Sequence, residues 1–216
     1  MNSLQKIVVS FQTRISMYGI GHTLGMAIKA CTRKLFGITW HRMILFSKEI
    51  PDVSSERANL QCYDIRRLSI ADFEAPLWKT SFLSERKRAI YELRFSSPDD
   101  ECYGIFVEGI LACIAWIHYG GLFIYNQFYV NTGEKSSYMY DAFCAPKFRR
   151  RGLQKIITAH RMNVASSKGI KKAFTAIATF NRPSLRTYKK NGYEEVIRFW
   201  IIEFRGHAYC SLKSLN

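Results

Sequence analysis

Three arginines followed by a glycine, Arg149–Gly152, form the stretch of this sequence best suited to chemistry. They follow the apolar run Ala142–Pro146, which is typical of a strand, and they precede a run with helical periodicity. Glycine lets a backbone come close to a ligand, and the first N–H groups of a helix have no acceptor within that helix. The stretch therefore predicts an anion site at a helix N-terminus, suited to a pyrophosphate.

A second spacing follows one predicted strand later in the chain. Asn181 is placed to cap a helix, and Tyr188 projects from the same side of that helix about two turns further on. Gly192 then ends the helix. An ordinary core tyrosine is the alternative to a role for Tyr188 at the ligand site.

The charge distribution favours a phosphorylated ligand. The formal net charge is +15, and every charged residue between Asp141 and Glu194 is basic, Arg161 included. Such a field attracts an anionic partner without selecting among cofactor, nucleic acid and membrane. A solvated basic helix face is the alternative for the arginines.

The elements that would position these residues form an α/β fold with a mixed sheet and a two-residue hairpin at Glu108-Gly109. From Gly109 to Val130 there is no charged side chain, yet the glycines and β-branched residues indicate buried strands rather than a membrane span. The predicted strands are 61–69, 103–107, 110–119, 123–130, 137–144, 171–179, 193–204 and 207–212, and the predicted helices are 69–82, 84–95, 152–168 and 181–191.

Two domains are predicted, a basic helical extension over 1–55 and a main domain over 56–216. Residues 1–48 contain no Asp or Glu, and apolar residues recur with helical spacing from Leu4 to Phe36. Two interpretations stay open: helices packed on the main domain, or docking on an anionic membrane or a lipid-linked substrate.

The cysteine pattern predicts reduced thiols in a cytoplasmic protein, because it shows no CxxC spacing and no signal peptide precedes it. We expect no metal site. The six cysteines are Cys31, Cys62, Cys102, Cys113, Cys144 and Cys210.

Between 61 and 204 the sequence resembles the GNAT superfamily of acyl-coenzyme A-dependent N-acyltransferases. The superfamily's phosphate-binding pattern, Gln or Arg, two residues, Gly, one residue, then Gly or Ala, falls on Arg149, Gly152 and Gln154. Gln154 replaces the usual small residue, although its backbone N–H can still bind phosphate. The resemblance implies a GNAT-like, mixed and mostly antiparallel central sheet with helices on both faces.

The resemblance also implies acetyl-CoA or another acyl-CoA as co-substrate, and a role for each residue that binds it. The strand Ala142–Cys144 would give main-chain bonds to the pantetheine arm. At this place the family's fourth strand, here 137–144, splays from its fifth strand, here 171–179. Asn181 would bond the cofactor arm, and Tyr188 would protonate the leaving thiolate. The full predicted set is Ala142, Phe143, Cys144, Arg149, Arg150, Arg151, Gly152, Leu153, Gln154, Lys155, Asn181 and Tyr188.

The base that activates the acceptor amine is less well defined by the sequence. Many family members carry a glutamate on the fourth or fifth strand, but the predicted strand 171–179 has no carboxylate. Asp141 is the nearest candidate, with His118, Glu134 or a chain of waters as alternatives. Cys144 has no matched histidine and is expected to be structural.

We expect an N-acyltransferase that acts on a small amine, such as an amino sugar or a lipid-linked precursor. Residues 141–146 and 182–185 look like those of uncharacterised GNAT enzymes of surface-polysaccharide synthesis. Two other classes stay open: a non-catalytic module that binds acyl-CoA or an anionic surface, and an RNA-directed enzyme acting on aminoacyl-tRNA. Basic residues do not cluster beyond the cofactor and N-terminal regions, so we expect no nucleic-acid partner. The location would be cytoplasmic, with a peripheral membrane contact through 1–48.

Overall fold

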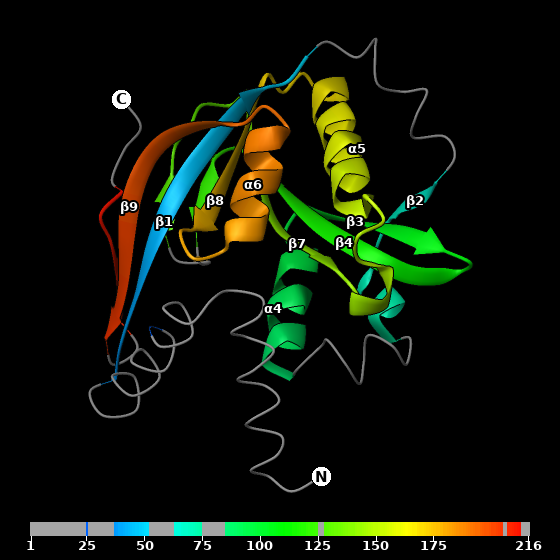
Figure 1. Cartoon of the computed structure of the whole chain (residues 1–216), viewed down its shortest axis with the longest axis horizontal. Helices are drawn as coiled ribbons and strands as arrows, with labels where there is room; N and C mark the ends of the chain where they lie inside the picture. Colours follow the sequence, from blue (N-terminus) through cyan, green and yellow to red (C-terminus); the bar gives the residue numbers. More distant parts are fainter. Residues whose placement is uncertain are drawn as a thin grey trace, which may run out of the picture. The chain divides into compact units, whose positions relative to one another are not determined.

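The computed structural model describes Gly25 and residues 37–51, 63–74, 85–124, 128–204 and 207–212. The chain divides into two compact units, and each is described by itself (Figure 1). The first unit holds Met1–Leu45 and Ala176–Lys213, and the second holds Phe46–Thr175 and Ser214–Asn216. Two strands, β1 (Ile38–Glu49) and β8 (Lys172–Ala178), run through both.

The second unit is built on an antiparallel sheet in the order β2, β3, β4, β7, with β8 parallel to β7. Its turn between β3 and β4 has Glu108 and Gly109 at φ 52° and 74°, the left-handed values that a two-residue hairpin requires. The predicted hairpin is therefore confirmed. The bounds are β2 Asp64–Arg67, β3 Asp100–Val107, β4 Ile110–Tyr119 and β7 Ser136–Cys144.

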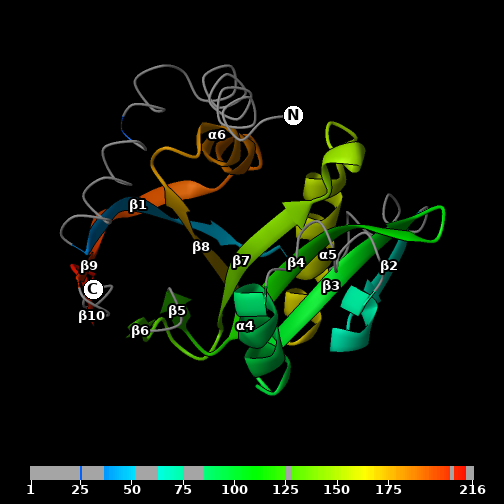
Figure 2. The same ribbon diagram turned by 90° about the horizontal axis from the view of Figure 1, so that it is seen from below.

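Helices α4 (Glu85–Phe95) and α5 (Leu153–Ser167) cover opposite faces of this sheet (Figures 1 and 2). On the α4 face, Tyr91 and Trp116 are fully buried and their ring centroids lie 5.2 Å apart. Both helices confirm the predicted ones. The predicted helix 69–82 begins as a 3-10 helix, η2 (Ile70–Glu74), and residues 75–84 lie outside the described part.

The segment after β4 differs from its prediction. Instead of one strand over 123–130, β5 (Leu122–Ile124) and β6 (Phe128–Val130) pair with each other in a separate two-stranded sheet. Gly120 and Gly121 precede β5 with positive φ values of 88° and 152°, so the chain turns away before β5 begins. Among the described residues, no helix is long and apolar enough to cross a membrane.

The first unit contains the strands β10, β9, β1 and β8 in that order, and helix α6 (Arg182–Lys190). The predicted C-terminal hairpin is present as β9 (Glu194–Phe204) and β10 (His207–Cys210), which pair antiparallel.

Strand β1 corrects the predicted helical extension over 1–55. Ile38–Glu49 is a strand, and its stretch from Met43 to Ser47 is buried without interruption. A strand buried on both faces loses the alternation that would identify it, so a short apolar run can be mistaken for a helix. The rest of the extension, 1–24, 26–36 and 52–55, lies outside the described residues.

These elements define an α/β fold with a mixed, mostly antiparallel sheet, as predicted. The sheet of the second unit has one helix on each face, and the parallel β7–β8 pair lies at one side of it. The segment that follows β7 carries the residues predicted to bind a phosphorylated ligand.

Candidate active site

Strand β7 leaves its parallel neighbour early. β7 and β8 pair over three residues each, Ser136–Tyr138 with Lys172–Phe174, while β7 continues to Cys144. The resemblance implied such a divergence between the family's fourth and fifth strands, which are β7 and β8 in this structure. It leaves the β8 side of Met139–Cys144 without strand pairing in the described structure.

Backbone alternation decides which groups of β7 face that open side. Ala145 N–H donates to Ala112 O at 2.9 Å, and in an antiparallel ladder bonded and non-bonded pairs alternate. The next pair, Cys113 and Cys144, therefore directs its backbone groups away from each other. Cys144 is better placed than Phe143 to bond a ligand, because the backbone groups of Phe143 face β4.

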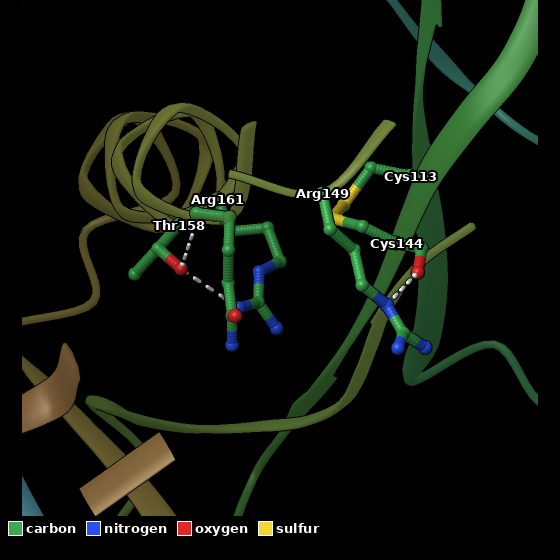
Figure 3. Close-up of a disulfide and its surroundings, with 6 residues drawn as sticks. Cys113, Cys144, Arg149, Thr158 and Arg161 are labelled. Atoms are coloured by element: carbon green, nitrogen blue, oxygen red, sulfur yellow. Dashed lines mark hydrogen bonds between the residues drawn. A yellow bond between two sulfur atoms is a disulfide. The ribbon is translucent and has the colours of Figure 1, made fainter. Parts of the chain in front are cut away.

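Cys113 and Cys144 form a disulfide, which corrects the prediction of reduced thiols for these two residues (Figure 3). Their Cα atoms lie 4.0 Å apart, since facing residues approach most closely in a non-hydrogen-bonded pair. Spacing along the chain gives no sign of this, because the register of β4 against β7 brings the two together. Cys102 and Cys210 are free thiols.

The turn between β7 and α5 has the geometry of an anion site. Arg150 and Gly152 adopt left-handed φ values of 64° and 75°, and backbone of alternating hand directs successive N–H groups to one side. The first bond of α5 runs from Lys155 N–H to Gly152 O at 2.9 Å. The N–H groups of Leu153 and Gln154 thus precede the helical ladder and have no acceptor within it. The predicted helix start is confirmed.

The charges of this turn are not neutralised by neighbouring carboxylates. Arg149, Arg150, Arg151 and Lys155 are exposed, and none forms an ion pair with a described Asp or Glu. Arg149 instead donates from Nε to Cys144 O at 3.1 Å, which ties the turn to the end of β7 (Figure 3). The turn 149–155 therefore combines four positive side chains with N–H groups that have no acceptor within the helix.

Helix α6 carries the second predicted spacing, in the first unit. Asn181 caps it, and its side chain accepts a hydrogen bond from Ser184 N–H at 3.3 Å, as predicted. The ring of Tyr188 is buried and meets the ring of Tyr193 edge to face at 4.9 Å. Tyr188 is 5% exposed, and its hydroxyl makes no hydrogen bond to a described residue.

Asp141, the candidate base, is engaged by neighbours that the sequence did not indicate. Its Oδ2 accepts from Arg94 Nη1 at 2.8 Å and from Tyr91 Oη at 3.2 Å, both on α4. Lys87 Nζ lies 4.0 Å from Oδ1. Burial raises the pKa of Tyr91, and the Asp141 charge raises it further, so the phenol stays a donor. Only the basic and aromatic residues of α4 could have hinted at this contact.

His118, an alternative base, belongs to another polar group on the same sheet face. Its Nδ1 lies 3.2 Å from Asp100 Oδ1, which also accepts from Tyr140 Oη at 2.5 Å. Burial would raise the pKa of Asp100, but the hydrogen bonds from His118 and Tyr140 outweigh it and leave that pKa lowered. Burial raises the pKa of Tyr140. Glu134, the third alternative, is exposed in the turn before β7.

The structure thus gathers the predicted residues into two groups. The strand 142–144 and the turn 149–155 adjoin in the second unit, and Asn181 and Tyr188 belong to α6 in the first. Among the described residues, no group of three or more His, Cys, Asp or Glu could hold a metal ion.

A sequence profile of the Acetyltransferase (GNAT) family matches residues 63–193, more than half of the chain. The match covers β2 to α6, and with it both groups of site residues. The protein therefore belongs to the GNAT acetyltransferase family. No curated protein sequence matches the chain.

Solved structures share the fold at low sequence identity. A conserved protein of unknown function from Staphylococcus epidermidis has a TM-score of 0.54 at 14% identity, over 94% of this chain and 82% of its own. A putative GNAT acetyltransferase from Novosphingobium aromaticivorans has 0.52 at 12%, over 76% and 64%. A Drosophila protein has 0.50 at 19%, over 87% and 58%. The chain thus spans less than two thirds of the latter two proteins.

Proposed function

We propose that this protein transfers an acyl group, with acetyl as the first to test, from acyl-CoA to the amine of a small molecule within a ternary complex. The observation that carries the proposal is the turn Arg149–Lys155. It combines, at one helix start, backbone N–H groups without helical acceptors and four cations that form no ion pair with a described Asp or Glu. A pyrophosphate needs both.

The residues present fit an acyl-CoA. The turn would hold the pyrophosphate, and Cys144 would offer its backbone to the pantetheine arm on the open side of β7. Gly152 leaves room for such a ligand, because a Cβ placed there would have no heavy atom within 4 Å. A bound acyl-CoA supplies an activated thioester, which is the chemistry that the side chains then assist.

The transfer itself needs an acid for the leaving thiolate and a base for the attacking amine. Tyr188, whose hydroxyl makes no hydrogen bond to a described residue, would give its proton to the leaving thiolate. Asp141 was the predicted base, but its Oδ2 already accepts from Arg94 Nη1 at 2.8 Å and from Tyr91 Oη at 3.2 Å, so α4 engages the carboxylate. We therefore assign deprotonation of the amine first to a water chain or to His118, with Asp141 third.

The acceptor we propose is a small amine, with amino sugars and lipid-linked precursors tested first. The test is a screen of purified protein with acetyl-CoA against amino sugars, amino acids and polyamines, reading thiol release and product mass. Amine-dependent thiol release above the rate of hydrolysis supports the proposal. Its absence with every amine, when acetyl-CoA is bound, refutes transfer to amines of these classes.

A second candidate is a non-catalytic acyl-CoA-binding protein, and the paired state of Asp141 favours it. Such a protein would bind acetyl-CoA and release no thiol with any amine. An RNA-directed enzyme is the third, and salt-dependent binding to tRNA would support it.

We keep the membrane contact as a proposal for residues 1–36 alone, since β1 occupies 38–49. Deleting 1–36 should weaken binding to liposomes that contain an anionic lipid and leave acetyl-CoA binding unchanged. Unchanged liposome binding contradicts the proposal. A cytoplasmic location stays a prediction, and detection of the Cys113–Cys144 disulfide in protein isolated from cells would count against it.

A further inference from the structure

The β4–β7 ladder carries a bulge directly before the strand proposed to bind pantetheine. Its register shifts between Ile114 and Trp116, so that Asp141 and Ala142 of β7 lie opposite the single residue Ala115. Asp141 adopts a φ of 43°, a left-handed value that residues other than glycine seldom take. The direction of the next three residues depends on this one backbone conformation.

One arginine holds the bulge from the α4 face. Arg94 donates to the Asp141 carboxylate at 2.8 Å, and its side chain is only 13% exposed. Its guanidinium lies over Tyr140 and Trp116, with Cζ 4.6 Å and 5.3 Å from the two ring centroids. Packing therefore fixes the arginine, and the arginine fixes the carboxylate of the bulge residue.

A second arginine holds the bulge from the α5 face. Arg161 has no exposed surface, and its Nη1 donates to the backbone oxygen of Trp116 at 2.5 Å. Its Nη2 lies 3.4 Å from Thr158 Oγ1, which donates to Gln154 O at 2.7 Å (Figure 3). This chain of bonds connects the bulge to the first turn of α5.

Neither arginine has the surroundings of a surface charge. Burying a guanidinium is costly without a carboxylate partner, and Arg161 forms no ion pair with any described Asp or Glu. The Nε atoms of Arg94 and Arg161 are buried and have no acceptor in the described structure. The sequence suggested that Arg161 belongs to the field around the ligand, but its guanidinium is enclosed and bonded to the β4 backbone.

The geometry points to Arg94 and Arg161 as positioning residues. They hold the β7 bulge at Asp141 from the two faces of the sheet and so fix the direction of the 142–144 backbone against a bound acyl-CoA. This inference rests on the proposed function. It gives Asp141 the role of an anchor for Arg94, in place of the base predicted from the sequence.

The test separates an anchor from a base. Arg94→Met should lower kcat about 10- to 100-fold with little change in CoA affinity, because a small misplacement of reacting groups has that effect. Asp141→Asn should lower kcat by the same factor, and the double variant by no more, since both changes break one ion pair. In the two single variants and the double variant, kcat should fall on the acid side of the pH profile at the same pH as in the wild type. Arg94→Lys should recover part of the activity.

A backbone rescue adds a readout that a merely structural role would not move. Glycine adopts a φ of 43° without strain, so Asp141→Gly in the Arg94→Met background should restore part of kcat. The matched control is Arg88→Met, on the same helix, whose guanidinium pairs with Glu74 and Glu92 and contacts no described residue of β7. It should leave kcat unchanged.

Hydrogen exchange decides the inference without turnover. The amides of 141–144 should exchange faster in Arg94→Met and Arg161→Met than in the wild type or Arg88→Met. Unchanged exchange at 141–144 overturns the inference, as does a larger loss in Asp141→Asn than in Arg94→Met together with loss of the fall in kcat on the acid side of the pH profile. If the methionine variants do not fold, Arg94→Lys and Asp141→Asn decide it. Failure of the wild type to bind acetyl-CoA would overturn the proposed function and leave the exchange result standing.

Discussion

The turn before α5 and helix α6 would serve one reaction by different means. In the turn, Arg149–Lys155, the groups proposed to bind the ligand are backbone N–H groups, and the turn also carries exposed arginines. In α6, the group proposed to act in the transfer is one hydroxyl, that of Tyr188, on a ring buried against Tyr193. Because of this difference, we expect changes in the turn to alter the affinity for acyl-CoA and changes in α6 to alter the rate of acyl transfer.

The largest expected effect comes from removing the Tyr188 hydroxyl. Tyr188→Phe should lower kcat by about 100- to 10,000-fold, the usual contribution of a general acid, because the thiolate would leave unprotonated. Affinity for acetyl-CoA should stay the same, since the ring keeps its packing. Steady-state thiol release and calorimetry measure the two. If Tyr188→Phe keeps the full kcat, then α6 takes no part in the acyl transfer. Tyr193→Phe is the matched control and should keep its rate.

The converse change in the turn should affect affinity first. Arg150→Ala with Arg151→Ala should weaken CoA binding about 10- to 100-fold, because two charge-assisted contacts to phosphate are lost. The kcat at saturating cofactor should change little. Arg66→Ala serves as the control, because Arg66 is an exposed arginine of the same unit paired with Asp64. An equal loss of CoA affinity in Arg66→Ala would mean that the net charge of the protein, and not the position of the arginines, determines binding.

A smaller effect is expected at the glycine that starts α5. Gly152→Ala should lower the free energy of unfolding by about 1–2 kcal/mol, because alanine pays to hold a φ of 75°. Crowding should add nothing, since no heavy atom lies within 4 Å of the new Cβ. Urea unfolding measures the stability. CoA affinity should fall with it, and an unchanged affinity would show that the turn keeps its shape without glycine.

The smallest effect is expected at the cap of α6. Asn181→Ala removes the bond from Ser184 N–H and should lower the free energy of unfolding by about 1 kcal/mol. Asn181→Asp restores a capping acceptor and should restore the stability. If Asn181→Asp matches the wild type in stability but still lowers CoA affinity, then Asn181 contacts the ligand directly, as the family resemblance implies.

Local patterns predicted much of the fold and of the site. Gly152 and Gly169 around α5, Asn181 before α6 and Glu108-Gly109 between β3 and β4 act through their own backbone, so their neighbours in sequence identify them. The turn Arg149–Lys155, proposed to bind pyrophosphate, belongs to this group. Its residues are consecutive, and their roles follow from helix geometry alone.

Features that depend on distant partners could not be predicted. Strand β1 was hidden because its neighbours β8 and β9 come much later in the chain. The Cys113–Cys144 disulfide arises from register, and the burial of Arg161 arises from a carbonyl group that the β7 bulge leaves available to it. Asp141 was expected to be a base because it is the nearest carboxylate in the sequence, and its partner Arg94 could not be foreseen because it lies on a helix far away along the chain.

The measurement that tests the account most directly is calorimetric titration of the wild-type protein with acetyl-CoA, beside the Arg150→Ala, Arg151→Ala variant. The account predicts one site, with affinity that falls as salt increases and that the double variant weakens. No heat of binding to the wild type at near-millimolar acetyl-CoA would contradict it, as would equal binding by the double variant.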